Sequence, residues 1–216
     1  MLIGKNMAIG CANHKELIVN FDKKIVRMID GEKAEYGFLF GNEKIVFIKS
    51  GAGGSVIARE NKYLKMAHKL HERLGATVIC SSNPDIESYL SGETLDEKAI
   101  HWVVKQKGFV NFEVYFIGNS DGAYKNFALA KKFPQTVKFL GINTSYIEVD
   151  ELIDKLKDLS DIDKILVCGT KDTDTMSYVE PAKNAEIPNL KIQLVEDANH
   201  EFSNMIDRFI DLVDLI

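Results

Sequence analysis

The 216-residue chain lacks several features that mark particular classes of protein. Lysine and arginine total 27 against 32 aspartate and glutamate residues, a net charge of −5, so no basic excess points to nucleic acid or an anionic membrane as the main partner. No apolar run approaches the roughly 20 residues that span a bilayer. The N-terminus soon reaches His14, Lys15 and Glu16 and has no continuous apolar stretch, which argues against a secretory signal. We expect a soluble, cytoplasmic protein.

Cysteine is scarce as well. Cys11, Cys80 and Cys168 are an odd number at wide spacing, so they predict neither a disulfide framework nor a zinc site. No internal repeat, low-complexity tract or Pro/Ser-rich linker divides the chain. The remaining composition, 45% apolar and 27% charged, is that of an ordinary globular protein. The length then predicts one domain over residues 1–216.

Strand-like segments alternate with segments of helical periodicity. The strand-like segments are short and rich in β-branched or aromatic residues: 44–49, 76–80, 113–118, 137–142, 164–168 and 190–195. Several are apolar at consecutive positions, as in strands that are covered on both faces. Apolar stripes at helical spacing run through residues 63–74, 152–159 and 202–213. Thr94 and Glu97 have the capping-box pattern of a helix start.

This alternation predicts an α/β fold whose sheet is mostly parallel, with helices on both faces and right-handed crossovers. The first 43 residues differ, because residues 16–30 and 35–41 have the pattern of antiparallel hairpin strands with no helix between them. We therefore expect a mixed sheet with antiparallel N-terminal strands. Ligand sites of such sheets lie beyond the carboxyl ends of the strands, so the residues that follow each strand are the candidates for chemistry.

One such segment has the pattern G-x-S-x-G. Gly118-Asn119-Ser120-Asp121-Gly122 follows a buried strand and precedes a helix-compatible stretch, residues 123–132. A serine on a sharp strand-to-helix turn exposes its hydroxyl, the small flanking residues avoid clashes, and the helix N-terminus favours developing negative charge. Ser120 is therefore a candidate nucleophile, and the competing interpretation is a helix N-cap.

A serine nucleophile needs a base, and the base needs an acid to orient it. His200 follows the last strand and precedes the last helix, and Asp172 follows the preceding strand in Gly169-Thr170-Lys171-Asp172. Both residues are expected at the same sheet edge as Ser120, although His200 could instead only cap the last helix. Asp174 in the same loop, and Glu148 or Asp150 after the strand before, remain alternative acids; Asp150 could instead be a helix N-cap.

These motifs, in the order Ser, Asp, His, resemble those of the α/β-hydrolase superfamily, in particular a small, lidless serine hydrolase. The resemblance covers residues 20–216 and implies a Ser–His–acid triad with no metal or organic cofactor. It also implies an oxyanion hole, with one donor the backbone N–H of Asp121. The other comes from the loop Ser50-Gly51-Ala52-Gly53-Gly54, where the family often begins with His-Gly. The resemblance points to the Ala52 N–H, with Gly53 as the alternate.

The sequence offers less support for two other kinds of site, a dinucleotide-binding loop and a metal site. The Gly51–Gly54 loop fails as a dinucleotide cradle because Val56 breaks the G-x-G-x-x-G spacing and no acidic residue ends the next strand. His68 and His71, three residues apart on a helix, could in principle bind a metal, but the pair is better explained by an exposed polar face.

The sequence therefore predicts a serine hydrolase that cleaves an ester, thioester or related acyl bond of a small-molecule or polymer-borne substrate. Only about 20 residues separate the strands ending near Ile142 and starting at Lys164, too few for the lid of many relatives, which predicts an open site. Two other functions remain: a catalytically inactive binding or assembly module, because a fold alone does not fix function, and an acyltransferase that uses the same triad. The substrate and the oligomeric state cannot be read from the sequence.

Overall fold

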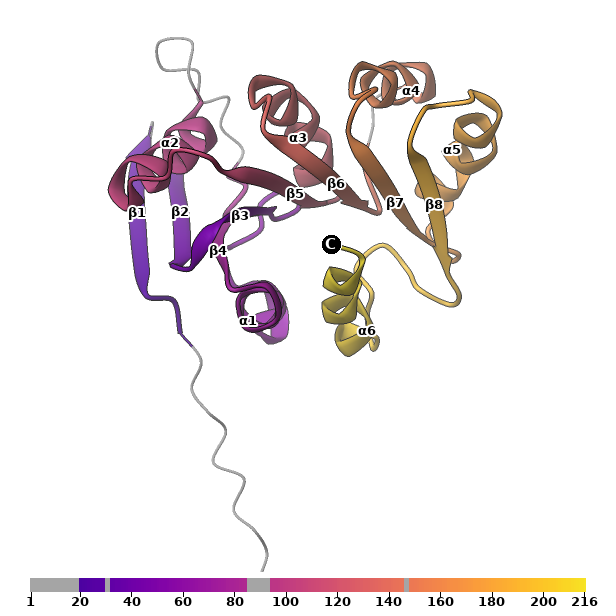
Figure 1. Ribbon diagram of the computed structural model, residues 1–216. Helices are drawn as coiled ribbons and strands as arrows, with labels where there is room; N and C mark the ends of the chain where they lie inside the picture. Colours follow the sequence, from indigo (N-terminus) through magenta and orange to yellow (C-terminus); the bar gives the residue numbers. More distant parts are fainter. Residues whose placement is uncertain (1–19, 30–31, 85–93, 146–147) are drawn as a thin grey trace, which may run out of the picture.

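The computed structural model, which describes residues 20–29, 32–84, 94–145 and 148–216, contains one twisted eight-stranded sheet (Figure 1). Its strands are β1 (Lys23–Ile29), β2 (Glu32–Leu39), β3 (Asn42–Lys49), β4 (Ala76–Ser81), β5 (Glu113–Asn119), β6 (Thr136–Ile142), β7 (Asp163–Gly169) and β8 (Leu190–Val195). The spatial order is β1-β2-β4-β3-β5-β6-β7-β8. β2 runs antiparallel to both β1 and β4, and all other neighbours are parallel. The expected mixed sheet is confirmed; residues 16–19 of the expected first strand lie outside the described residues.

The winding of the sheet reverses at β3. β4 and β5 pair with opposite sides of β3, so the crossover into β4 and the one into β5 lead in opposite directions. The loops that follow β3 and β5 consequently meet at the carboxyl edge of the sheet, where open α/β sheets bind their ligands. These are the loops that contain Gly51–Gly54 and Ser120.

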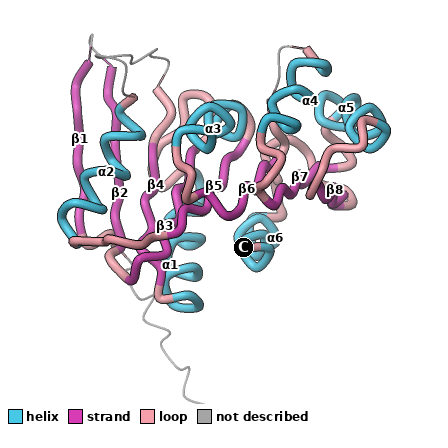
Figure 2. The backbone as a smooth tube through the Cα atoms, turned by 45° about the horizontal axis from the view of Figure 1, so that its top comes forward, coloured by secondary structure: helices cyan, strands magenta, loops and turns pink. Residues whose placement is uncertain are grey.

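Helices cover both faces of the sheet. The helices are α1 (Lys62–Leu74), α2 (Leu95–Lys107), α3 (Asp121–Lys132), α4 (Val149–Asp158), α5 (Thr173–Asn184) and α6 (Ile206–Asp211), with 3-10 turns η1 (Arg59–Asn61) and η2 (Leu212–Leu215). In Figures 1 and 2, α1 and α6 lie together on one face, and α2 to α5 line the other. The predicted capping box at the start of α2 is present, with the Thr94 side chain accepting from the Glu97 N–H.

Each face has its own apolar core, because successive side chains of a strand point to opposite sides. Along β3, Val46 and Ile48 join the core under α1 and α6, whereas Ile45 and Phe47 join the core under α2 to α5. All four side chains are buried. This two-sided burial is why the strand sequences are continuously apolar rather than alternating.

The last helix is shorter than its apolar stripe predicts. Phe202 and Met205 belong to the stripe, but the helix α6 begins only at Ile206. Phe202 and Asn204 have φ values of 54° and 63°, which a right-handed helix does not allow. Phe202 is nevertheless fully buried. The apolar stripe therefore predicts correctly that this side chain is buried, although the backbone at Phe202 is a turn and not a helix. None of the helices in the described part of the chain has the length and apolarity that crossing a bilayer requires.

Candidate active site

Ser120 lies on a strained turn between β5 and α3. Its φ of 53° and ψ of −128° are unusual for a residue with a side chain, and its N–H donates to the Ile142 carbonyl at 2.9 Å. Ser120 occupies the N-cap position of α3, but its side chain makes no capping hydrogen bond. The hydroxyl is therefore not used as a cap.

The two glycines of the motif are required by close packing. A Cβ on Gly118 would lie 2.2 Å from the Ala123 Cα, and a Cβ on Gly122 would lie 2.2 Å from the Ser50 carbonyl oxygen. Both distances are shorter than van der Waals contact. The motif thus lets α3 start directly against the ends of β5 and β3, and this holds the turn at Ser120 in its strained form.

The structure brings Ser120, His200 and Asp172 together. The His200 Nε2 lies 2.9 Å from the Ser120 Oγ, and the His200 Nδ1 lies 2.7 Å from the Asp172 Oδ2. The His200 side chain is 37% exposed, whereas that of Asp172 is 5% exposed. In the tautomer with the proton on Nδ1, the ring donates to Asp172 and its free Nε2 can accept the Ser120 proton.

Asp172 rather than Asp174 contacts the histidine. The Asp172 Oδ1 also accepts from the Thr175 N–H, so this carboxylate caps α5 with one oxygen and binds the imidazole with the other. Asp174 is exposed in the first turn of α5. Glu148 and Asp150 are both exposed at the start of α4, where Glu148, and not Asp150 as the sequence suggested, takes the N-cap position.

The loop after β3 passes beside Ser120. A Cβ on Gly51 would lie 3.3 Å from the Ser120 Cβ. The Gly53 N–H donates to the Asn83 carbonyl, so it could serve as an oxyanion donor only if this hydrogen bond broke. The Gly54 N–H donates to the Gly51 carbonyl. Within the described residues no backbone acceptor engages the N–H of Ala52 or that of Asp121, the first residue of α3. Of the expected donors, these two are the ones that remain available.

Asn83 holds this loop in place. It is buried, its N–H donates to the Gly54 carbonyl, and its Nδ2 donates to the Ser50 carbonyl and to the Asp121 carboxylate at 3.1 and 2.8 Å. One asparagine therefore joins the loop after β3 to the first turn of α3. Sequence reasoning missed Asn83, because a single amide after a strand carries no motif.

Two more residues of the site follow β6. The Asn143 side chain is fully buried; its Nδ2 donates to the Asn199 and His200 carbonyls, and its Oδ1 accepts from the Gly169 N–H. The Ser145 Oγ lies 2.8 Å from the Ser120 Oγ. When Ser120 donates to His200, Ser145 must be the donor to Ser120. The rule that ligand sites follow strands points to the segment after β6, but neutral side chains there match no position of the Ser–His–acid pattern.

The other candidates have structural roles. The His68 and His71 rings are half-buried and each contacts a different backbone carbonyl, of Asn20 at 3.0 Å and of Ala76 at 2.8 Å, so the expected exposed face is only partly correct. Across the described residues no group of three or more His, Cys, Asp or Glu side chains is placed to hold a metal ion. Burial raises the pKa of the Cys80 thiol, and that of Cys168 to about 11. Cys11 and His14 lie outside the described residues.

Comparison with known proteins gives a clear result at the level of the fold. No family model matches the sequence, and no curated protein is found as a sequence relative. Among solved structures, an alpha-beta serine hydrolase homologue from Coxiella burnetii is similar over 90% of this chain and 97% of its own, with a TM-score of 0.63 and 15% identity. The dienelactone hydrolase from Anabaena variabilis is similar over 89% and 94% of the two chains, with a TM-score of 0.64 and 14% identity.

A third similar structure is the thioesterase domain from the curacin biosynthetic pathway, which matches over 88% of this chain and 98% of its own, with a TM-score of 0.59 and 12% identity. At these identities the likeness concerns the backbone rather than the substrate. The strand order, the turn at Ser120 and these matches agree, and together they show that this chain has the α/β-hydrolase fold.

Proposed function

We propose that this protein is a serine hydrolase that cleaves an ester, thioester or related acyl bond through Ser120, His200 and Asp172. The observation that carries the proposal is the chain of contacts from the Ser120 Oγ to the His200 Nε2 and from Nδ1 to the Asp172 Oδ2. These residues are 80 and 28 positions apart in the sequence, so only the fold unites them. The similar structures, which include hydrolases and a thioesterase domain, support the same class of chemistry.

In the first step His200 Nε2 takes the Ser120 proton while Oγ attacks the acyl carbonyl carbon. The negative charge that develops on the carbonyl oxygen is stabilised by the N–H groups of Asp121 and Ala52. The N-terminus of α3, the positive end of the helix dipole, stabilises it further. Asp172 fixes the imidazole tautomer and stabilises the imidazolium. When the tetrahedral intermediate collapses, the proton passes from His200 to the departing alcohol or thiol, and an acyl-Ser120 ester remains.

In the second step His200 accepts a proton from water, and the resulting hydroxide attacks the acyl carbonyl. Collapse returns the proton from His200 to Ser120 and releases the acid. All groups in this scheme are amino-acid side chains or backbone amides. The partly exposed His200 ring gives water direct access and suits an open site. We further propose a small-molecule or polymer-borne acyl group as the substrate and a cytoplasmic location.

Steady-state hydrolysis of short esters and of an acyl thioester tests the proposal. We expect Ser120→Ala and His200→Ala each to lower kcat by about a thousandfold or more, with the folded state retained. Ser160→Ala, at an exposed serine after α4, is the matched control and keeps full activity. If the wild-type protein and Ser120→Ala are equally inert towards all substrates, the fold serves as a binding module. Product analysis with an added alcohol distinguishes hydrolysis from acyl transfer.

A further inference from the structure

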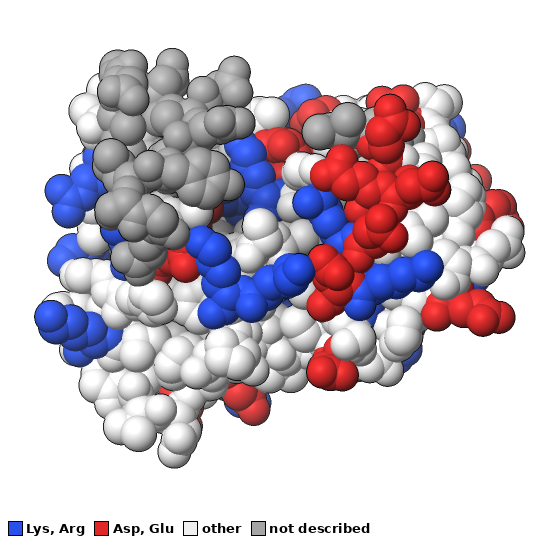
Figure 3. All heavy atoms as spheres, turned by 90° about the horizontal axis from the view of Figure 1, so that it is seen from above, with Lys and Arg blue, Asp and Glu red and all other residues white. Residues whose placement is uncertain are grey.

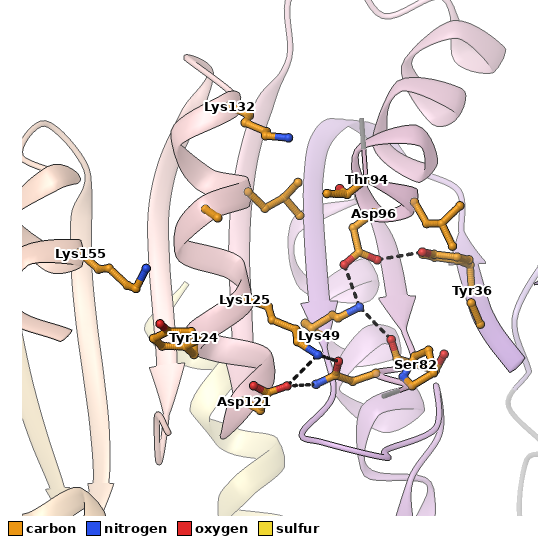
Figure 4. A pocket seen from close by; sticks show the side chains of 16 residues that line it. Tyr36, Lys49, Ser82, Thr94, Asp96, Asp121, Tyr124, Lys125, Lys132 and Lys155 are labelled. Atoms are coloured by element: carbon orange, nitrogen blue, oxygen red, sulfur yellow. Dashed lines mark hydrogen bonds and ion pairs between the residues drawn. The ribbon is translucent and has the colours of Figure 1, made fainter. Parts of the chain in front are cut away.

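A cavity of about 500 Å³ opens between α2 and α3, next to the candidate active site (Figure 4). Its wall includes Asp121, the residue after Ser120, and Asn83, which holds the loop after β3. This volume is in the range of small-molecule sites, about 300–1,000 Å³. Four lysines line the cavity, Lys49, Lys125, Lys132 and Lys155, against two carboxylates, Asp96 and Asp121. That basic bias is unexpected in a chain of net charge −5.

The floor of the cavity is a closed polar network. The Lys49 ammonium group lies 2.7 Å from the Asp96 carboxylate and donates to the Ser81 hydroxyl and the Ser82 carbonyl. The other Asp96 oxygen accepts from the Tyr36 and Ser81 hydroxyls. Because these donors and acceptors satisfy one another, the floor supplies shape and rigidity rather than a free charge for a ligand.

The lysines of the rim are different. Lys125 and Lys132 come from α3 and Lys155 from α4, and their side chains are 41%, 37% and 29% exposed. Figure 3, which looks onto the α2–α5 face, shows basic side chains gathered around its centre and acidic side chains along one side.

Each rim lysine pairs with a carboxylate. Lys132 contacts Glu97 at 2.5 Å and Lys155 contacts Glu151 at 3.4 Å, and neither glutamate lines the cavity. Lys125 lies 3.0 Å from Asp121. The Lys125–Asp121 and Lys155–Glu151 pairs are partly exposed and contribute little to stability, so these two ammonium groups can turn to an anion inside the cavity at small cost. The Glu97 side chain is only 10% exposed, so Lys132 keeps this contact and presents its remaining N–H groups to the anion.

The rest of the wall is apolar. Ala34 from β2, Leu95 from α2 and the α3 residues Ala128 and Leu129 line it. An apolar wall with cationic groups at its rim suits a molecule with a hydrocarbon body and an anionic end, such as a carboxylate or a phosphate. Lysine binds such groups as a flexible point charge and needs no fixed bidentate geometry.

The cavity is also mechanically joined to the candidate active site. The Lys125 ammonium donates to the Asn83 Oδ1 at 2.9 Å, while the Asn83 side chain donates to the Ser50 carbonyl. One wall of the cavity and the loop expected to supply an oxyanion donor are therefore parts of one hydrogen-bonded unit. A molecule in the cavity lies against Asp121, the residue that follows Ser120, although Ser120 itself does not line the cavity.

We propose that this cavity binds the anionic end of the acyl substrate, so that the preferred substrates are esters or thioesters that carry a carboxylate or phosphate group. The inference rests on the proposed function for its kinetic part and on the cavity alone for its binding part. Lys132 and Lys155 are the specificity residues, because Lys49 is fully engaged with Asp96 and Lys125 helps to hold Asn83.

Binding is tested first, without any reaction. Adipate and inorganic phosphate are titrated calorimetrically into the wild type, into Lys132→Gln/Lys155→Gln, and into the control Lys131→Gln/Lys157→Gln, whose exposed lysines are on the same helices but outside the cavity lining. We expect saturable binding of at least one anion to the wild type and the control, and an affinity about tenfold lower for the first variant. Which anion binds identifies the chemistry. No saturable binding, or equal binding to all three proteins, overturns the proposal.

Kinetics provide the second test. Mono-para-nitrophenyl adipate is compared with its neutral methyl ester, and para-acetoxybenzoate with its own methyl ester, so that the charge lies on the acyl group in one pair and on the leaving group in the other. The wild type should prefer the anionic member of one pair by about tenfold in kcat/KM, and added salt should reduce this preference. In Lys132→Gln/Lys155→Gln the preference should fall to about twofold, whereas Lys131→Gln/Lys157→Gln should retain the wild-type preference.

The two tests distinguish the proposal about the cavity from the proposal that the protein is a hydrolase. Hydrolysis of neutral and anionic esters at equal rates would contradict the cavity proposal and leave the hydrolase intact. Saturable anion binding that requires Lys132 and Lys155, in a protein that cleaves no ester, would support the cavity and contradict the hydrolase.

Discussion

At the residue scale, the position of His200 depends on Asn143. The Asn143 backbone has a φ of 42°, a conformation that asparagine tolerates better than most residues, and its side chain bonds to the backbone of both Gly169 and His200. It thus ties the end of β7, which leads to Asp172, to the loop that carries the imidazole. Asn143 acts as a positioning residue through these backbone contacts.

Asn143→Ala should lower the free energy of unfolding by about 1–3 kcal/mol, because buried carbonyl and N–H groups lose their partner. The loss of ester hydrolysis should be larger than this destabilisation explains, since the imidazole loses its alignment. Urea unfolding and kcat, measured on the same samples, check both effects. Asn189→Ala is the control: Asn189 has a φ of 54° and donates to the Ser160 carbonyl, but it is exposed. If both variants keep full activity, Asn143 has a structural role only.

Ser145 should affect the chemical step itself. Its hydroxyl contacts the Ser120 Oγ at 2.8 Å and restrains the nucleophile. Ser145→Ala should lower kcat about fivefold, the equivalent of one hydrogen bond of about 1 kcal/mol, with little change in KM. Ser145→Thr keeps the hydroxyl and should restore most of the rate. An unchanged kcat in Ser145→Ala, or a threonine variant as slow as the alanine variant, would contradict this role.

The site residues that could be predicted from the sequence lie in recognisable local patterns, and those that could not be predicted do not. Ser120 was recognisable because glycines surround it for steric reasons, and His200 and Asp172 because they follow the last two strands. Asn83, Asn143 and Ser145 also follow strands, but their roles depend on which backbone groups lie nearby in space. Those neighbours come from distant segments, and a local pattern cannot specify them.

At the scale of elements, the contact between α3 and the end of β3 fixes the site. At Gly122 the two backbones approach closely, with the Ser50 and Lys49 carbonyl oxygens 2.2 and 2.6 Å from the position that a Cβ would take. The backbone oxygens cannot move aside as a flexible side chain could. The spacing between Ser120 and the loop after β3 is therefore set at this glycine.

Gly122→Ala should destabilise the protein by about 1–3 kcal/mol through overpacking, and it should reduce hydrolysis strongly because α3 and its N–H groups shift. Thermal unfolding and kcat/KM measure the two effects. The control is Gly108→Ala at the end of α2, where a Cβ meets nothing within 4 Å but φ is +68°. This variant should lose stability through backbone strain and keep its kcat/KM. An active Gly122→Ala protein would contradict the close-approach argument.

Most elements could be predicted from the sequence, and their boundaries less well. Continuous apolar runs identified the parallel strands because both faces of the sheet are covered. The stripe over residues 202–213 predicts one helix, but Phe202 itself and Asn204, just before α6, have positive φ. The order of β4 and β3 in the sheet could not be predicted, because it depends on long-range pairing.

At the scale of the whole molecule, one buried ion pair joins the sheet to α2. Lys49 at the end of β3 and Asp96 in the first turn of α2 have side chains that are 7% and 15% exposed, and Asp96 also accepts from Tyr36 of β2. β2, β3 and α2 thus share one carboxylate, although α1 and β4 separate β3 from α2 in the sequence. Its removal would leave an ammonium group buried without a counter-charge.

Asp96→Ala should therefore lower the free energy of unfolding by about 3–5 kcal/mol in urea titrations. The exposed pair Lys131–Asp158, in which both side chains are 52% exposed, provides the comparison, and Asp158→Ala should cost less than about 1 kcal/mol. Equal free energies of unfolding for the two variants would contradict the claim that Lys49 depends on Asp96 as its counter-charge.

The central claim is that Ser120 is a nucleophile activated by His200, and covalent labelling tests it most directly. The wild type, Ser120→Ala and His200→Ala are incubated with a fluorophosphonate, and the adduct is located by mass spectrometry of peptides. The account predicts one adduct on Ser120 in the wild type, none in Ser120→Ala, and labelling at least about a hundredfold slower in His200→Ala. A wild-type protein that stays unlabelled while folded, or an adduct on another residue, would contradict it.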